Sequence, residues 1–396
     1  MEHRHETCSP TISRTIDRCC HAVGEARRRE SAGLSARAIT IIVPFAPGGG
    51  TDVSARVVGE YMSSTLRQQF VVENFPGAGG TTGTIRAMRA SPDGYTIEMG
   101  HIGTHAVSVW LYPQLAYKPD VDFEPIGLAM ETPLVIVARK DFPPKNLEEF
   151  IAYVKANSEN LNMGHAGVGS ILYSFGLMLN SILGVRPTLV PFNGGGPATS
   201  ALLGGQIDYT CGAITDVASH VHAGALKAYA IAADERSSVL PNVPITEEAG
   251  LPEFKAIPWF ALFAPRGTPR PILDKLSASL DKALDDQKVR SRFSDLGGYV
   301  PEKARRGQQA LAMLVKDEIA RWAPIIKTAN ISHQDSEHKS VNASTPVDVR
   351  FTPKSGHRSA RSGCPLCAKS GHSALRQILL FDGHRTGSAF FGGRCC

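Results

Sequence analysis

The chain has 396 residues and a formal net charge of +5, with 42% hydrophobic residues. This length exceeds one ordinary domain and the apolar content can fill two cores, so we expect two lobes. The positive charge is spread along the chain and forms no basic stripe, which excludes a typical nucleic-acid binder. No run approaches the roughly 18 apolar residues of a membrane-spanning helix, so no membrane anchor is expected.

Residues 1–37 are polar and rich in Arg and His. They lack the apolar segment of roughly 7 to 15 residues that defines a signal peptide. We therefore expect an atypical N-terminal extension and not an export signal as the sequence stands.

Strands are predicted at six short runs rich in β-branched residues and bounded by Gly, Pro or Asp. These runs are ITIIVPF (39–45), FVVE (70–73), YTIEM (95–99), LVIVA (134–138), QIDYT (206–210) and KAYAIA (227–232). Between the first two, apolar residues follow helical spacing from Val53 to Leu66. The alternation of strands and helices predicts an α/β fold with mostly parallel sheets.

A glycine turn follows the first strand. The strand runs into PFAPGGGTD (44–52), where a helix is expected to begin. Consecutive glycines place no Cβ near their backbone N–H groups, and a helix start adds partial positive charge. The turn is therefore predicted to favour an anion, each exposed contact being worth about 0.3 to 1 kcal/mol.

The second strand repeats this arrangement, because VVENFPGAGGTTG (71–83) leads into a helix expected over 81–90. Turns after consecutive strands meet at the carboxyl edge of one sheet, where open α/β sheets bind ligands. We therefore predict that the two turns lie side by side and form one anion site. The alternative is that both are only tight turns.

Nucleotide and catalytic motifs are incomplete. Gly77 and Gly79 begin a G-x-G-x-x-G pattern, but Thr82 stands at its third glycine, and no P-loop is present. Ser170 is not in a G-x-S-x-G elbow and has no apparent base. His220 and His222 are interpreted as surface residues. We expect no catalytic residue, no cofactor and no metal in the body.

Two apolar stripes close the body. Thr268 and Pro269 predict a helix start, as cap and first turn, ahead of the stripe over 272–284. A second stripe runs from Leu311 to Trp322. Both are predicted to face the core.

From Ser332 onward the chain loses periodicity, and 332–396 is predicted to be disordered or non-native. Cys364 and Cys367 with His372 resemble part of a zinc knuckle, but Gln377 stands at the fourth ligand position. The body holds one cysteine, Cys211, so cysteine usage leaves the compartment open.

The body, about 38–331, resembles the Bug-type, TctC-like periplasmic receptors of tripartite tricarboxylate transporters. The resemblance is carried in order by VPFAPGGGTD (43–52), VENFPGAGGTTG (72–83), PDGYTIEMG (92–100), GVGS (167–170), FNGGGPA (192–198), LLGGQID (202–208), LPNVPITEEAGLPEF (240–254) and WFALFAPRGTP (259–269). It implies a two-lobed class II periplasmic-binding-protein fold with the ligand in a cleft between the lobes. Lobe 1 would comprise 38–136 plus 232–331, and lobe 2 would comprise 137–231.

The same resemblance implies a periplasmic, monomeric receptor that is not an enzyme and binds no nucleic acid. It would capture a small organic carboxylate and deliver it to the membrane permease subunits of a tripartite tricarboxylate transporter. The ligand contacts implied in the first lobe are Pro47, Gly48, Gly49, Gly50, Thr51, Asp52, Gly77, Ala78, Gly79, Gly80, Thr81, Thr82 and His105. Those implied in the second lobe are Gly167, Gly169, Ser170, Phe192, Asn193, Gly194, Thr215 and Asp216.

Two residues depart from the family pattern. Tyr173 replaces a usual His, and Asn193 replaces the Lys of an aromatic-Lys-Gly turn. A neutral Asn weakens the inference of a highly charged ligand such as citrate. Two alternatives stay open, an α/β enzyme acting on a small anionic substrate and a ligand sensor with the same fold. A converging acid/base or metal set would favour the enzyme, and none can be assembled from the sequence.

Overall fold

The computed structural model describes residues 37–328. The predictions for the N-terminal extension and for the tail, including Cys364, Cys367 and His372, lie outside the described residues. Within 37–328, no helix combines the length and the apolar character needed to cross a bilayer.

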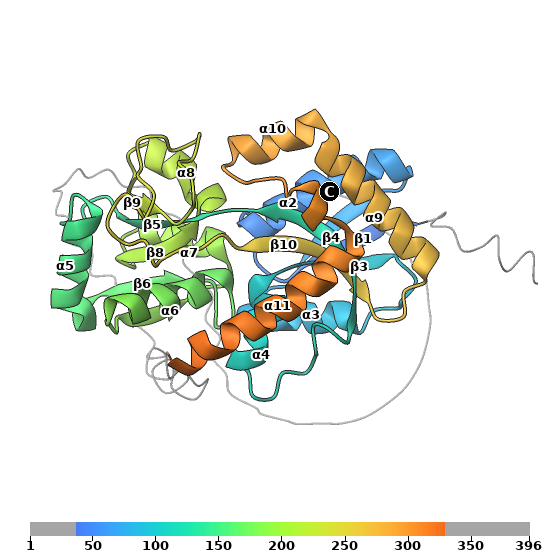
Figure 1. Ribbon diagram of the computed structural model, residues 1–396, viewed down its shortest axis with the longest axis horizontal. Helices are drawn as coiled ribbons and strands as arrows, with labels where there is room; N and C mark the ends of the chain where they lie inside the picture. Colours follow the sequence, from blue (N-terminus) through green and yellow to red (C-terminus); the bar gives the residue numbers. More distant parts are fainter. Residues whose placement is uncertain (1–36, 329–396) are drawn as a thin grey trace, which may run out of the picture. The chain divides into compact units, whose positions relative to one another are not determined.

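The first sheet has the strand order β2-β1-β3-β10-β4, and four of its strands, β1, β3, β4 and β10, are labelled in Figure 1. Its strands are β1 (Ile39–Val43), β2 (Phe70–Asn74), β3 (Thr96–His101), β4 (Phe123–Glu131) and β10 (Trp259–Pro265). It is accompanied by helices α2 (Gly50–Leu66), α3 (Thr81–Met88), α4 (Ser108–Leu111), α9 (Arg270–Asp285), α10 (Gln287–Asp295) and α11 (Gly307–Thr328). Strands β2 and β3 pair with β1 in parallel, whereas β10 is antiparallel to both of its neighbours.

The second sheet has the order β7-β6-β8-β5-β9. Its strands are β5 (Leu134–Arg139), β6 (Asn162–His165), β7 (Thr188–Pro191), β8 (Tyr209–Ala213) and β9 (Leu226–Ile231). Its helices are α5 (Leu147–Asn157), α6 (Ile171–Leu183), α7 (Gly195–Leu203) and α8 (Ile214–His222). Strand β5 is antiparallel to β8 and β9. Each sheet with its helices is called a lobe below.

The chain crosses between the sheets twice. Strand β4 ends at Glu131 and β5 begins at Leu134, so only Thr132 and Pro133 link them. The return runs through 232–258, between β9 and β10. In each sheet the one reversed strand, β5 or β10, is the first strand after a crossing. The lobe boundaries at 137 and 232 stay predictions.

All six predicted strands overlap observed ones, but the run predicted over 206–210 shares only Tyr209 and Thr210 with β8. Strands β4, β6, β7 and β10 were not predicted. Strand β4 contains Pro125 and Gly127, which are unusual inside a strand. Strands β6 and β7 have only 4 residues each, so their hydrophobic patterns are too short to predict a strand. Mostly parallel sheets were expected, but four of the eight strand pairings are antiparallel, and all four involve β5 or β10.

The start of α9 differs from the prediction by one residue. Pro269 is the N-cap, and the Thr268 hydroxyl donates to the Pro265 carbonyl at 2.8 Å, so Thr268 does not cap the helix. Extended backbone at Pro269 and a proline inside the first turn begin the helix without a side-chain cap. The apolar stripes are core as predicted, because Leu276, Leu311 and Trp322 are fully buried.

Candidate functional site

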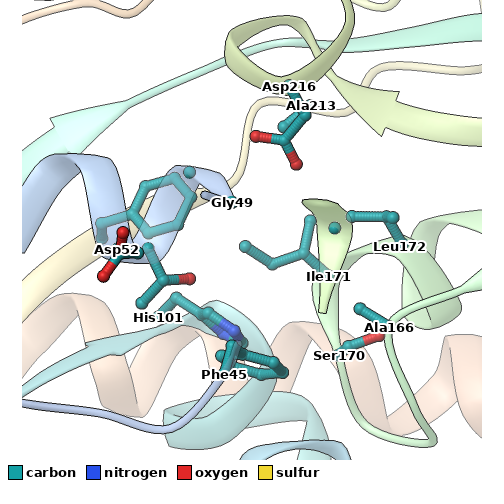
Figure 2. Close-up of a pocket in the computed structure, with 14 residues that line it drawn as sticks. Phe45, Gly49, Asp52, His101, Ala166, Ser170, Ile171, Leu172, Ala213 and Asp216 are labelled. Atoms are coloured by element: carbon teal, nitrogen blue, oxygen red, sulfur yellow. The ribbon is translucent and has the colours of Figure 1, made fainter. Parts of the chain in front are cut away.

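The first glycine turn brings the N-terminus of α2 to a cavity between the two sheets. Gly48 has φ +87°, a left-handed conformation that favours glycine. Gly49 is the N-cap and supplies no side chain, so α2 has no cap of its own for its first N–H groups. Figure 2 shows Gly49 and Asp52 on one side of the cavity, with Asp216, Ile171 and Ser170 across from them.

The cavity has a volume of about 30 Å³. That volume holds roughly two water molecules. It has no Lys or Arg in its lining. The lining residues are Phe45, Gly49, Gly50, Thr51, Asp52, His101, Ala166, Ser170, Ile171, Leu172, Gly195, Ala213, Asp216 and Phe260.

Asp52 secures the turn. Its carboxylate accepts two hydrogen bonds from Arg56, both at 2.9 Å, one from the Gly48 N–H at 3.1 Å and one from Asn74 Nδ2 at 3.0 Å. Burial opposes ionisation, but the bonds from Arg56, Asn74 and Gly48 outweigh it and lower the pKa of Asp52. Asp52 is therefore ionised, and its charge is neutralised by Arg56.

His101 is a lining residue that the sequence analysis missed. Its Nδ1 accepts the N–H groups of Gly103 at 2.9 Å and Thr104 at 3.2 Å, which places the ring proton on Nε2. Burial lowers the pKa of His101 to about 3, so the imidazole is a neutral donor at physiological pH. The ring stacks on Phe45 at 4.8 Å (Figure 2). One signal was available, because His101 ends the third strand at the carboxyl edge that carries both glycine turns.

Asp216 enters from the second lobe. It accepts a hydrogen bond from the Thr215 hydroxyl at 3.0 Å and another from the Gly50 N–H at the start of α2. A methyl group on Gly195, the first residue of α7, would lie 2.1 Å from Asp216 Oδ2. Burial raises the pKa of Asp216 to about 7, against the lowering effect of the bonds from Thr215 and Gly50. The carboxyl group therefore lies against the N-termini of two helices from two lobes.

The second glycine turn does not line the cavity. It lies beside the first turn, as predicted, because a methyl group on Gly80 would be 2.7 Å from the Phe45 ring. Within the turn, the Thr81 hydroxyl donates to the Ala78 carbonyl at 2.9 Å, and Thr82 Oγ1 would lie 2.9 Å from a methyl group on Gly77. A methyl group on Gly79 would lie 1.5 Å from the carbonyl oxygen of Val168 in the second lobe. This turn meets the opposite lobe directly.

Other predicted residues lie along the same junction between the lobes. The Ala46 N–H donates to the Asn193 carbonyl at 2.9 Å, and a methyl group on Gly194 would lie 3.2 Å from Ala46 N. A methyl group on Gly196 would lie 3.2 Å from the Pro47 carbonyl oxygen. Phe192 is half-buried and its N–H donates to the His165 carbonyl.

The GVGS loop faces both the junction and the cavity. Gly167 and Gly169 have φ of +99° and +84°. Ser170 lines the cavity, and its Oγ caps α6 by accepting the Tyr173 N–H at 3.2 Å. The Tyr112 hydroxyl of the first lobe reaches the Val168 carbonyl at 2.7 Å.

His105 requires a correction. It was predicted to contact the ligand, but it is fully buried and does not line the cavity. Its ring stacks on Phe263 at 3.8 Å, and its Nδ1 lies 3.0 Å from the Thr104 hydroxyl. Aromatic packing beneath β3 explains its position. In residues 37–328 no group of three or more His, Cys, Asp or Glu could hold a metal ion.

Comparison with known proteins identifies the family. The family described as "Tripartite tricarboxylate transporter family receptor" matches residues 54–331. The chain belongs to this family. Among the receptor's relatives, a UPF0065 protein from the TAR-I ttuE-ttuC' intergenic region of Agrobacterium vitis is 43% identical over 291 residues, which cover 74% of this chain and 84% of the relative.

Two solved structures resemble this chain over about three quarters of its length. MatC from Rhodopseudomonas palustris, solved with bound malate, is 49% identical with a TM-score of 0.72, covering 74% of this chain and all of MatC. The periplasmic binding protein BugD is 39% identical with a TM-score of 0.73, covering 75% of this chain and 99% of BugD. These likenesses confirm the predicted Bug-type, TctC-like family and the two-lobed binding-protein fold.

Proposed function

We propose that this receptor captures a small organic carboxylate in the cleft between its lobes, in the periplasm, and delivers it to a tripartite tricarboxylate-type permease. The observation that carries the proposal is the N-terminus of α2, which has no capping side chain of its own and lies at a cavity that both lobes line. A helix N-terminus favours negative charge by up to about 2 kcal/mol when it is partly buried.

The remaining lining provides suitable donors. His101, Thr51 and Ser170 line the same cavity, and they carry an Nε2–H and two hydroxyl groups. Each can donate to a carboxylate oxygen without adding a formal charge. The malate bound to MatC, a relative with 49% identity, supports a ligand of this chemistry.

Ligand capture requires the lobes to separate. A cavity of about 30 Å³ is too small for any dicarboxylate. The two connections, Thr132-Pro133 and 232–258, are the segments about which the lobes can move apart. Closure over a ligand would re-form contacts such as the one between Ala46 and Asn193.

Binding without turnover is the second part of the proposal. Ser170 Oγ caps α6 and has no imidazole partner among the residues that the structure describes. Asp52 is held by Arg56, and His101 by two backbone N–H groups. The arrangement therefore provides donors for an anion and no activated nucleophile.

Screening the full chain by thermal shift against mono-, di- and tricarboxylates and amino acids tests the proposal. A ligand at 100 times its Kd should add about 2.7 kcal/mol of stability. Chromatography of the ligand after incubation should recover it unchanged. If no carboxylate stabilises the protein, or if the ligand is altered faster than with denatured protein, the proposal is wrong.

A further inference from the structure

Asp216 lies where an incoming carboxylate would bind. Its carboxyl group accepts the Gly50 N–H at the start of α2, and a methyl group on Gly195, the first residue of α7, would lie 2.1 Å from its Oδ2. Neither helix has a side-chain cap of its own, and N–H groups at a helix start are the natural partners of an anion. A ligand carboxylate bound at the start of α2 would therefore lie against Asp216 and compete with it for the Gly50 N–H.

No positive side chain is available to separate the two carboxyl groups. The cavity lining contains three titratable residues, Asp52, His101 and Asp216, and neither Lys nor Arg. Asp52 is already paired with Arg56, and His101 is neutral. The other groups near Asp216 are the Thr215 hydroxyl and the backbone of Gly49, Gly50 and Gly195. The Phe260 ring lies beside Gly50. None of these groups carries a charge.

Two carboxylates in contact within a closed cavity cannot both stay ionised, because their repulsion raises the pKa of one of them. Building on the carboxylate-receptor function proposed above, we propose that ligand binding is coupled to the uptake of one proton by Asp216, which then donates a hydrogen bond to the ligand carboxylate. One proton passes from solvent to the Asp216 carboxylate for each ligand bound. Asp216 thereby selects carboxylates without help from a lysine or an arginine.

Burial already raises the pKa of Asp216 to about 7 before a ligand arrives. At pH 6.0 the residue is mostly protonated in the free protein, so binding takes up little further proton. At pH 8.5 the free residue is ionised, and binding must bring the proton in. Affinity should then fall about tenfold for each pH unit above about 7.5, as linkage requires for one coupled proton.

Titration calorimetry of the full chain with L-malate, adipate and the strongest binder of the carboxylate screen tests this coupling. Measurements at pH 8.5 in two buffers of different ionisation enthalpy should give an uptake of about one proton, against nearly zero at pH 6.0. Asp216→Asn is isosteric with the protonated residue, so it should bind with little dependence on pH and take up no proton. Asp141→Asn, at an exposed residue of the same lobe, is the control and should behave as wild type.

Each outcome is decisive. Binding heat at pH 8.5 that is independent of the buffer overturns the coupling while leaving the carboxylate receptor intact, and this result needs no variant. An Asp216→Asn protein that keeps the wild-type pH dependence overturns the assignment to Asp216. The absence of binding heat with every carboxylate overturns the receptor function and the coupling together.

Discussion

Gly79 of the first lobe lies directly against the backbone carbonyl of Val168 in the second, so closely that a methyl group would lie 1.5 Å from that oxygen. Gly79 also has φ +62°, which a side chain disfavours. The sequence predicted that this glycine lets backbone approach the ligand. The structure instead shows backbone approaching backbone across the junction, so its effect on binding would act through lobe closure.

Gly79→Ala should therefore weaken ligand binding by at least tenfold, because the added methyl group keeps the lobes apart. Folding should suffer less, with about 1 to 2 kcal/mol lost to the left-handed conformation. Calorimetry with the best carboxylate measures the affinity, and urea unfolding measures the stability. Small-angle scattering should show that the variant contracts less than wild type when ligand is added.

Gly205→Ala is the matched control for Gly79→Ala. Gly205 is exposed after α7, has a similar left-handed φ of +70°, and a methyl group there would meet nothing within 4 Å. It should leave affinity unchanged. If Gly79→Ala folds and binds as tightly as wild type, direct contact at Gly79 is not required for the bound state.

Tyr112→Phe removes a hydroxyl that joins the lobes. The phenol oxygen lies 2.9 Å from the Ala78 carbonyl and 2.7 Å from the Val168 carbonyl. Its single proton bonds one of them at a time, so the loss should be close to one hydrogen bond, about 0.5 to 1.5 kcal/mol. Affinity should fall about two- to tenfold by calorimetry, with little change in the chain's unfolding midpoint.

Tyr61→Phe, on a half-buried residue of α2, provides the comparison for Tyr112→Phe. Equal affinities of the two variants would argue that the Tyr112 hydroxyl does not stabilise the closed form.

His101→Asn tests the donor that lines the first-lobe side of the cavity. The Asn side-chain oxygen can still accept the N–H groups of Gly103 and Thr104, while the Nε2–H is lost. We expect affinity for the best carboxylate to fall about tenfold or more, because the ligand loses a buried donor. Since the pKa of His101 is about 3, the loss should be the same at pH 6 and pH 8.

His222→Asn, at the exposed end of α8, controls for the change of residue type and should bind normally. A His101→Asn protein with wild-type affinity would show that the imidazole does not contact the ligand.

The sequence predicted the parts of the site that depend on local backbone chemistry. The turn at Gly48 to Asp52 could be predicted from its glycines and the helix that follows, and in the structure Gly49 to Asp52 line the cavity. Asp216 was reached through the family resemblance, and it also lines the cavity. What local pattern could not supply is the pairing of distant segments.

Three particulars show this limit. The Gly79–Val168 contact joins residues from different lobes, and no periodicity encodes which face of a turn meets the opposite lobe. His101 and His105 are close in sequence, yet His101 lines the cavity and His105 is buried in the core. Strand β10 reverses direction because the chain returns from the other lobe, which its own sequence does not reveal.

Acid stability can be predicted from His165, at the end of β6. Its Nδ1 accepts the Gly167 N–H at 3.1 Å, and burial lowers its pKa to about 4, against the raising effect of that bond. The unfolded chain, with a pKa near about 6.5, binds a proton at this residue before the folded chain does. The residue therefore does not lower the free energy of unfolding above about pH 6.5. As pH falls from there toward about 4, it lowers that free energy by about 1.4 kcal/mol per pH unit.

His165→Asn replaces Nδ1 by an oxygen acceptor that cannot be protonated in this range. Relative to its own stability at pH 7.5, the variant should lose about 2 kcal/mol less than wild type by pH 5.0, as 1.5 pH units at 1.4 kcal/mol require. Urea unfolding at pH 7.5, 6.0 and 5.0 measures the difference, with the exposed His222→Asn as control. Parallel stability profiles for wild type and His165→Asn would mean that this imidazole is protonated in the folded protein, and its buried neutral state would be disproved.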